Sequence, residues 1–254
     1  MTPAGGPPRA GGRAHYSYRH YADPQVAEGF DALRFGGPIG RLLLEDQQAI
    51  LTEALAPLPG RTVVDVGSGT GRAALALAAG GASVIALDAS SQMLAVARRR
   101  AGETGVALGL GMSDAHALPL ADRSVDAAVC LRVLMHALQW EQCVAELCRV
   151  ARWRVIVDYP AAASLAFFES AARRLWQRTG RPVEAYRVLS HRAVARAFAA
   201  HGFRITQRRP QFVLTTRLHK RVNRPGFTRG VEGALAAVGL QRLFGSPVTI
   251  VAER

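Results

Sequence analysis

Residues 61–72 read Arg61-Thr-Val-Val-Asp-Val-Gly-Ser-Gly-Thr-Gly-Arg72, and this stretch decides the fold. Residues 62–66 are β-branched and apolar apart from Asp65, which predicts a short strand buried on both faces. Three glycines follow at alternate positions, and residues 73–78 predict a helix. A strand, a tight glycine turn and a helix N-terminus bring backbone N–H groups close to a ligand. The open helix end suits a negative group of that ligand, and the Asp65 carboxylate suits a positive one.

A second buried strand is predicted over residues 83–88, Ser83-Val-Ile-Ala-Leu-Asp88, and it ends in an acid. In dinucleotide-binding folds, an acid in this place binds the two hydroxyls of a ribose. The dinucleotide fingerprint also needs Gly or Ala three positions after its second glycine, where this chain has the larger Arg72. NAD is therefore disfavoured, whereas a ribose-bearing ligand without a pyrophosphate still fits.

Three short motifs carry a resemblance to a known family. They are Asp65-Val-Gly-Ser-Gly-Thr-Gly71, Leu87-Asp88-Ala-Ser90, and Ser113-Asp114-Ala115 followed by Leu118-Pro119-Leu120. In this order and spacing they resemble motifs of the class I S-adenosylmethionine-dependent methyltransferases. The likeness is greatest to the branch called methyltransferase type 11, which includes small-molecule and quinone-type enzymes. It covers residues 60–160 and weakens on either side.

The resemblance implies an α/β fold with a doubly wound, seven-stranded, mainly parallel sheet, the Rossmann-like methyltransferase fold. It implies S-adenosylmethionine as the cofactor and S-adenosylhomocysteine as the product. The cofactor-binding residues that it implies are Asp65, Gly67, Ser68, Gly69, Thr70, Gly71, Asp88, Ala89, Ser90, Met93, Ser113, Asp114, Ala115, Leu131 and Arg132.

Some of these positions have a second interpretation. Met93 either packs in the core or contacts the adenine ring. Asp114 either accepts a hydrogen bond from the adenine amino group or forms an ordinary Asx turn. Arg132 is open between a cofactor contact, an acceptor contact and a surface charge. His136 follows a strand predicted at 124–131 and is the candidate catalytic base, because its unperturbed pKa lies near neutrality. It could equally bind the cofactor or cap the next helix.

The flanks of the motif region predict one domain over residues 15–254. N-terminal helices at 15–58 would form a lid over the site, with Arg34 and Phe35 within reach of it, and tyrosines gather at 16, 18 and 21. The cofactor-binding core spans 61–160, with a third strand at 106–110 and a fifth at 154–159. The acceptor side spans 161–254.

The last two strands, predicted at 203–209 and 247–252, would form a hairpin with one strand antiparallel to the rest in the family plan. In this chain residues 210–246 separate them. These residues hold a basic stretch (217–229) and a predicted helix (231–244). We interpret them as a helical insertion before the last strand, beside the acceptor site.

Charge is divided unevenly along the chain. Residues 1–150 hold 13 Arg and 14 acids, a net charge of −1, whereas residues 151–254 hold 18 Arg, one Lys and 5 acids, a net charge of +14. A basic half fits an anionic membrane surface, an acidic acceptor or nucleic acid. Composition bias explains the preference for Arg over Lys, but not the shortage of acids in the second half.

Other features of the sequence bear on where in the cell the protein is expected to act. No run approaches the ~20 apolar residues of a transmembrane helix. Residues 1–14 are rich in Gly and Pro, lack the apolar core of a signal peptide, and predict a disordered tail. Cys130, Cys143 and Cys148 show no metal-ligand spacing, so they predict packing residues in a reduced, cytoplasmic protein without a bound metal.

Together these features predict methyl transfer from S-adenosylmethionine to a small or lipid-like acceptor, with an anionic group on the acceptor and a peripheral membrane contact as options. Positioning in a dry pocket would be the main contribution of the protein. One alternative is an RNA methyltransferase, although the chain lacks an Asn-Pro-Pro-Tyr signature and an appended RNA-binding module. The other alternative is a non-enzymatic protein that binds S-adenosylmethionine. The acceptor atom and the oligomeric state stay open.

Overall fold

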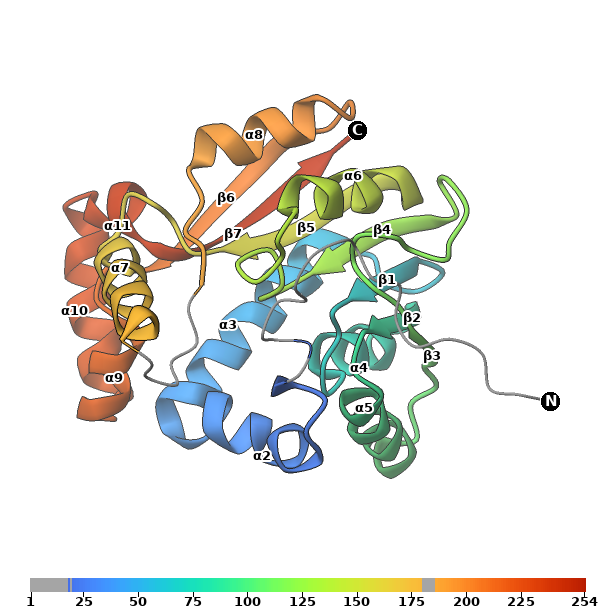
Figure 1. The fold of residues 1–254 in the computed structure, drawn as a ribbon, viewed down its shortest axis with the longest axis horizontal. Coiled ribbons are helices and arrows are strands. Elements are labelled where there is room, and N and C mark those ends of the chain that lie inside the picture. The colour runs from blue at the N-terminus through green and yellow to red at the C-terminus, as the bar shows by residue number, and fades with distance from the viewer. Residues whose placement is uncertain (1–17, 19, 180–185) are drawn as a thin grey trace.

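The computed structural model describes residue 18, residues 20–179 and residues 186–254 (Figure 1). The tail predicted at 1–14, and Tyr16 of the tyrosine-rich stretch, lie outside the described residues. Within them, no helix is both long and apolar enough to cross a bilayer.

Seven strands form one sheet in the order β3-β2-β1-β4-β5-β7-β6. β1 to β5 run parallel, whereas β7 is antiparallel to both of its neighbours. The predicted doubly wound, mainly parallel sheet is therefore confirmed, with its one antiparallel strand. The strands are β1 (Thr62–Val66), β2 (Ser83–Asp88), β3 (Gly109–Met112), β4 (Val125–Cys130), β5 (Ala151–Tyr159), β6 (Arg204–Phe212) and β7 (Ser246–Glu253).

Helices cover both faces of the sheet because its central strands are apolar on both sides. Val63 and Val64, adjacent in β1, belong to two different core clusters, one packed with α3 and α4 and the other with α6 and α8. The helices are α2 (Pro24–Phe35), α3 (Gly37–Leu55), α4 (Arg72–Ala79), α5 (Ser91–Thr104), α6 (Trp140–Val150), α7 (Leu165–Arg178), α8 (His191–Ala199), α9 (Thr216–Val222), α10 (Pro225–Ala237) and α11 (Leu240–Phe244).

The three cysteines lie in the core cluster that includes α6, and each is free and buried. Burial raises the pKa of each thiol, most strongly that of Cys130. Their prediction as packing residues is confirmed.

Two predicted elements are wrong in their bounds. The third strand is β3, not residues 106–110, because α5 continues to Thr104 and ends at Gly105 with a φ of 68°. Residues 106–108 then lead back to the sheet edge. The helix predicted at 231–244 is two helices, because Gly239 adopts a φ of 78° between α10 and α11. The basic stretch at 217–229 is itself largely helical, in α9 and the first turns of α10.

Candidate active site

A cavity of about 530 Å³ opens at the carboxyl ends of the parallel strands. In open α/β sheets this edge is where ligands bind. The glycine turn after β1 and the ends of β2, β4 and β5 form one side of its wall, and α2, α7 and α9 contribute to the other. The sheet edge and helices far apart in the sequence therefore enclose one space.

The three alternate glycines face different surroundings, although each has a positive φ. A Cβ on Gly67 would lie 2.2 Å from a methyl carbon of Val133, and one on Gly71 would lie 2.9 Å from the Cβ of Ala97. A Cβ on Gly69 would meet nothing within 4 Å. Gly67 and Gly71 are therefore required by packing, whereas Gly69 borders open cavity.

Asp65 lies beneath this turn and is only 2% exposed. Burial, helped by the nearby Asp88 carboxylate, raises the pKa of its carboxyl to about 7. Its Oδ2 atom and the Oγ atom of Ser68 have no hydrogen-bond partner among the described residues. Buried polar atoms are normally satisfied, so two orphaned atoms in a cavity wall are the atoms that a ligand would engage.

Asp88, at the end of β2, has both carboxylate oxygens held in place. The Gly69 N–H donates to Oδ2 and the Ser90 N–H donates to Oδ1, each at 2.8 Å. Burial nevertheless raises the pKa of this carboxyl. Each oxygen can accept a further hydrogen bond, which is the arrangement that a pair of ribose hydroxyls requires.

Ser90 joins the N-terminal segment to α5. Its hydroxyl donates to the Tyr21 carbonyl at 2.6 Å and accepts from the Met93 N–H at 3.1 Å, which makes it the N-cap of the helix. Met93 both lines the cavity and packs in a small cluster with Ala27 and Val96. Its two interpretations are therefore compatible.

The loop after β3 brings Ser113, Ala115 and His116 to the wall, but not Asp114. The Asp114 carboxylate accepts a hydrogen bond from the Tyr18 hydroxyl at 2.7 Å on one oxygen, and contacts the His116 ring at 2.6 Å with the other. Its part in adenine recognition stays a prediction, and its visible role is to hold Tyr18 beside the loop.

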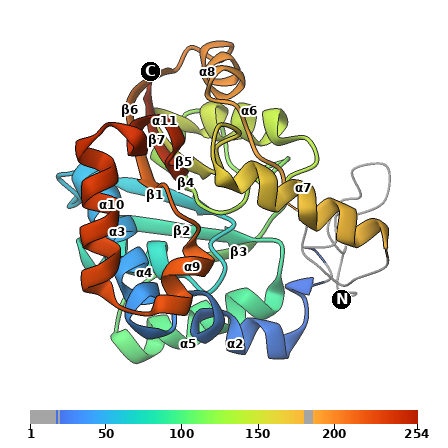
Figure 2. The ribbon, with the colours of Figure 1, turned by 90° about the vertical axis from the view of Figure 1, so that its left-hand side faces the viewer.

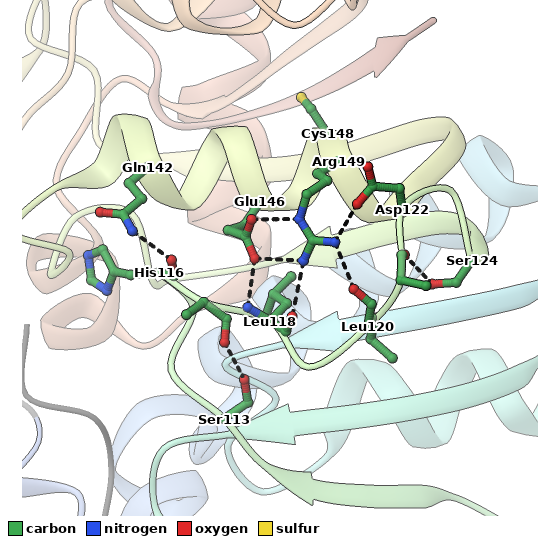
Figure 3. A network of polar contacts seen from close by, with 12 residues as sticks. Ser113, His116, Leu118, Leu120, Asp122, Ser124, Gln142, Glu146, Cys148 and Arg149 are labelled. Atoms are coloured by element: carbon green, nitrogen blue, oxygen red, sulfur yellow. Dashed lines mark hydrogen bonds and ion pairs between the residues drawn. The ribbon is translucent and has the colours of Figure 1, made fainter.

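A polar network fastens the same loop to α6 (Figure 3). The Arg149 guanidinium pairs with Glu146 at 2.7 Å and donates to the Leu118 carbonyl at 3.0 Å. Glu146 accepts from the Leu118 N–H at 2.7 Å, and Gln142 donates to the His116 carbonyl at 2.8 Å. Side chains of α6 therefore hold the wall segment that follows Ser113 in place through hydrogen bonds to its backbone.

α2 is attached to the glycine turn through Asp31, which sequence reasoning missed. The Asp31 carboxylate accepts from the Thr70 hydroxyl at 2.9 Å and pairs with Arg72 at 3.2 Å and with Arg100. Arg72 also stacks on Phe35, with its guanidinium carbon 3.2 Å from the ring centroid. Burial lowers the pKa of Arg72 to about 10. Arg34 and Phe35 line the cavity, while the motion implied by the word lid stays a prediction.

The end of β4 delivers Leu131, Arg132 and His136 to the wall. Arg132 adopts a φ of 64°, and its N–H donates to Asp158 near the end of β5. Asp158 is 2% exposed and lines the cavity, and burial raises the pKa of its carboxyl. The signal that could have found Asp158 is the one that found Asp65 and Asp88, an acid near the end of a buried strand.

The far end of the cavity is formed by α7, α9 and the segments around them. One face of α7 contributes Glu169 and Arg173, which pair at 2.9 Å. Tyr186 lies beside them, and burial raises the pKa of its phenol to about 12, so it stays a hydrogen-bond donor. From α9, Lys220 donates to the carbonyls of Leu33 and Arg34 at 3.0 and 2.7 Å. α9 is thereby fixed to the last turn of α2.

A buried cluster supports this end of the cavity without lining it. The His219 ring contacts Glu232 at 2.8 Å and Thr228 at 3.1 Å, and His219 is 1% exposed. Glu232 also accepts from the N–H groups of Val213 and Leu214 at 2.8 and 3.0 Å. The cluster has the residue types of a nucleophilic triad, but its position makes it a brace for the wall at residues 213–214.

All the predicted site residues line the cavity except Gly71 and Asp114. Gly71 lies behind the wall because it is the N-cap of α4 and packs against α5. The wall residues that the sequence did not single out come mostly from outside the motif region, from α7, α9 and the segments around them.

Comparisons with known proteins agree with this geometry. Residues 64–154, just over a third of the chain, match the family model described as a methyltransferase domain. The chain is similar to the demethylmenaquinone methyltransferase of Clavibacter sepedonicus, at 40% identity over 102 residues, which is 40% of this chain and 41% of that protein. The chain thus spans about two fifths of the length of the curated relatives that it matches.

Solved structures share the fold. Magnesium protoporphyrin IX methyltransferase from Synechocystis PCC 6803, crystallised with bound S-adenosylhomocysteine, superposes with a TM-score of 0.60 at 22% identity, over 93% of this chain and 91% of that one. A geranyl diphosphate methyltransferase in complex with GPP and sinefungin gives a TM-score of 0.63 at 17% identity, over 83% and 77% of the two chains.

Proposed function

We propose that this chain, whose residues 64–154 match a methyltransferase domain, is a class I S-adenosylmethionine-dependent methyltransferase that transfers a methyl group from S-adenosylmethionine to a small, lipid-like acceptor. The observation that carries the proposal is the unpartnered Oδ2 of Asp65, buried in the same cavity wall as Asp88 and the open side of Gly69. A ligand with a cationic amine and a ribose would satisfy both acids.

The residues present fit that cofactor. Asp65 would pair with its ammonium group, Asp88 would accept from its ribose hydroxyls, and Met93 and Ala115 would border its adenine. When bound, S-adenosylmethionine supplies an electrophilic methyl group on a sulfonium. The chain's own residues then act by placement, because effective molarity and exclusion of water account for much of such a rate enhancement. His136, in the wall after β4, is the candidate base if the acceptor must lose a proton.

The far end of the cavity suits an amphiphilic acceptor. Its wall is apolar at Met135, Leu165 and Leu214, among other positions. It also holds Arg217, whose side chain pairs with no described acid. Lys220 is nearby, and burial together with the positive charges of Arg34 and Arg132 lowers its pKa. Like charges gathered in one cavity favour an acceptor with an anionic group.

The names of the relatives support a lipid-like acceptor. A demethylmenaquinone methyltransferase is a relative over the cofactor-binding region, and a fold neighbour was crystallised with GPP. The acceptor end of this chain lies outside the region matched by the family model, so its contacts, and not the names, must select the substrate.

The test is transfer of radiolabelled methyl from S-adenosylmethionine into three pools: a lipid extract, water-soluble metabolites and total RNA. We expect label in the lipid extract only, and Asp88→Ala should reduce it strongly when S-adenosylmethionine is kept near its wild-type dissociation constant. Label in RNA would establish the alternative of an RNA methyltransferase. Binding of S-adenosylmethionine without transfer to any pool would favour a non-enzymatic binding protein.

Cofactor binding should depend on pH through Asp65. Its carboxyl has a pKa of about 7 in the free protein, and a bound ammonium stabilises the charged form and lowers that pKa. Binding below pH 7 therefore releases a proton, and affinity should rise up to about tenfold per pH unit until pH 7, then level off. Above about pH 8 the amine of the cofactor itself loses its charge.

Isothermal titration with S-adenosylhomocysteine between pH 5.5 and 7.5, in two buffers of different ionisation enthalpy, measures both affinity and proton release. Asp65→Asn should flatten the pH dependence and remove the proton release. The same slope in wild type and Asp65→Asn would assign the titration to another group.

A further inference from the structure

α7 is apolar on the side that faces away from the cavity. One face of the helix, with Leu165 and Glu169, lines the cavity. The opposite arc carries Phe167, Phe168 and Leu175, which are 49%, 69% and 60% exposed. A helix at a protein surface normally presents polar side chains there, and among the described residues nothing covers this apolar arc.

The turn between α9 and α10 mixes the same apolar character with positive charge. Leu218 and Phe227 are 39% and 40% exposed, and Arg217, Arg221 and Arg224 lie exposed beside them in the sequence. None of these arginines forms an ion pair with a described residue, while Glu169 pairs with Arg173 and Glu232 binds His219. The turn therefore carries a net positive charge, and the Asp46 carboxylate of α3 acts on Arg229, further along α10.

α7, α9 and α10 lie on one side of the molecule, the side that faces the viewer in Figure 2. Other residues of α7 and α9 line the cavity, so the helices that carry these exposed groups also form part of the wall at its acceptor end. We call these groups the mouth surface; it comprises Phe167, Phe168, Arg174, Leu175, Arg217, Leu218, Arg221, Arg224 and Phe227.

We propose that the mouth surface docks on an anionic lipid bilayer, so that a lipid-like acceptor enters the cavity directly from the membrane. Aromatic and aliphatic side chains would enter the boundary between headgroups and acyl chains, and the arginines would face the anionic headgroups. This charge complementarity explains the shortage of acids near the C-terminus, which composition bias leaves unexplained. The choice of a bilayer over a protein partner rests on the lipid-like acceptor of the proposed function.

The test is co-sedimentation of the full chain with vesicles of phosphatidylcholine alone or mixed with phosphatidylglycerol, without cofactor or acceptor. We expect binding to the anionic vesicles that weakens with added salt, and little binding to neutral ones. Arg221→Gln/Arg224→Gln should weaken it about 25-fold, or about fivefold for each charge removed. Phe168→Ser/Leu175→Ser should weaken it about tenfold. None of these four residues lines the cavity.

Matched controls lie elsewhere on the surface. Arg192→Gln/Arg196→Gln removes the same charge from exposed positions of α8, and Met112→Ser removes a side chain that is 53% exposed on β3, at the other sheet edge. Both control variants should bind like wild type. Equal weakening by both arginine pairs would assign binding to the net charge of +13 and overturn the proposal.

Two other results would also overturn it. One is the absence of binding to anionic vesicles. The other is a dimer in light scattering that Phe168→Ser/Leu175→Ser dissociates, since a second copy would then cover the mouth surface. Because vesicle binding is measured without methyl transfer, its failure would leave the proposed function standing. Failure of methyl transfer would likewise leave a vesicle-binding result intact.

Discussion

Gly69→Val is expected to abolish binding of S-adenosylmethionine while leaving the chain folded. A Cβ at Gly69 would meet no atom within 4 Å outside its chain neighbours, and Gly69 lines the cavity with Asp88, so a valine there would take volume that the ligand needs. Its φ of 55° strains any other residue, at a cost on the order of 1–2 kcal/mol. Domains of this size are stable by about 5–15 kcal/mol, so folding should survive.

Gly67→Val is the matched control, two residues away in the same turn. There a Cβ would lie 2.2 Å from a side-chain carbon of Val133, which is partly buried and packs against the core. We expect this variant to lose its cooperative melting transition, or to melt far below wild type. Titration calorimetry and thermal melting of both variants separate the two roles. If Gly69→Val also lost its melting transition, Gly69 would be required for folding, and its loss of binding would say nothing about the cofactor site.

Much of the candidate cofactor side of the cavity wall could be predicted because its signals are local. Asp65 and the glycine turn adjoin in sequence, and Asp88 ends the next strand, so periodicity and turn chemistry place them without tertiary information. The same logic reaches Ser90 and Met93, which cap and begin α5. Parallel strands bring their carboxyl ends to one edge, and that general rule was enough to assemble these residues.

Contacts across long sequence distances could not be predicted. Asp31 reaches the glycine turn 39 residues away, and Lys220 binds carbonyls of α2 across 186 and 187 residues. Asp31 does not stand out, because an acid on a helix usually faces water, and Lys220 stands out only as part of the basic stretch, which says nothing of a contact with α2. Asp114 shows the converse case: its motif was visible, but the Tyr18 hydroxyl that engages its carboxylate lies 96 residues away.

The basic half shows why a charge count leaves the partner undecided. Arg154, Arg173 and Arg209 pair with Glu253, Glu169 and Glu53, so part of the excess is neutralised within the fold. The remaining positive charge can select a partner only where several unpaired basic side chains lie close together. Arg217 and Lys220 lie in the cavity wall, whereas Arg221 and Arg224 lie outside it. One basic stretch therefore contributes both to the cavity wall and to the mouth surface, and Arg217 belongs to both.

Asp88→Ala should weaken cofactor binding by about 2–3 kcal/mol, close to a hundredfold, because charge-assisted hydrogen bonds to two hydroxyls are lost. The variant also leaves the N–H groups of Gly69 and Ser90 without their acceptors, so a loss of affinity alone does not identify the hydroxyls. The distinction comes from changing the ligand as well as the protein.

A 2′,3′-dideoxy analogue of S-adenosylhomocysteine removes the hydroxyls from the other side. Wild type should bind this analogue about a hundredfold more weakly than the parent compound, whereas Asp88→Ala should bind the two compounds nearly equally, because the interaction is already absent. A purely structural role for Asp88 predicts a different outcome. Asp88→Ala would then lower the affinity for both ligands by the same factor, and it would still bind the dideoxy analogue more weakly than the parent compound. Titration calorimetry of both proteins with both ligands distinguishes the two roles. If the losses of binding free energy from the substitution and from removal of the hydroxyls are additive, Asp88 does not bind the ribose hydroxyls.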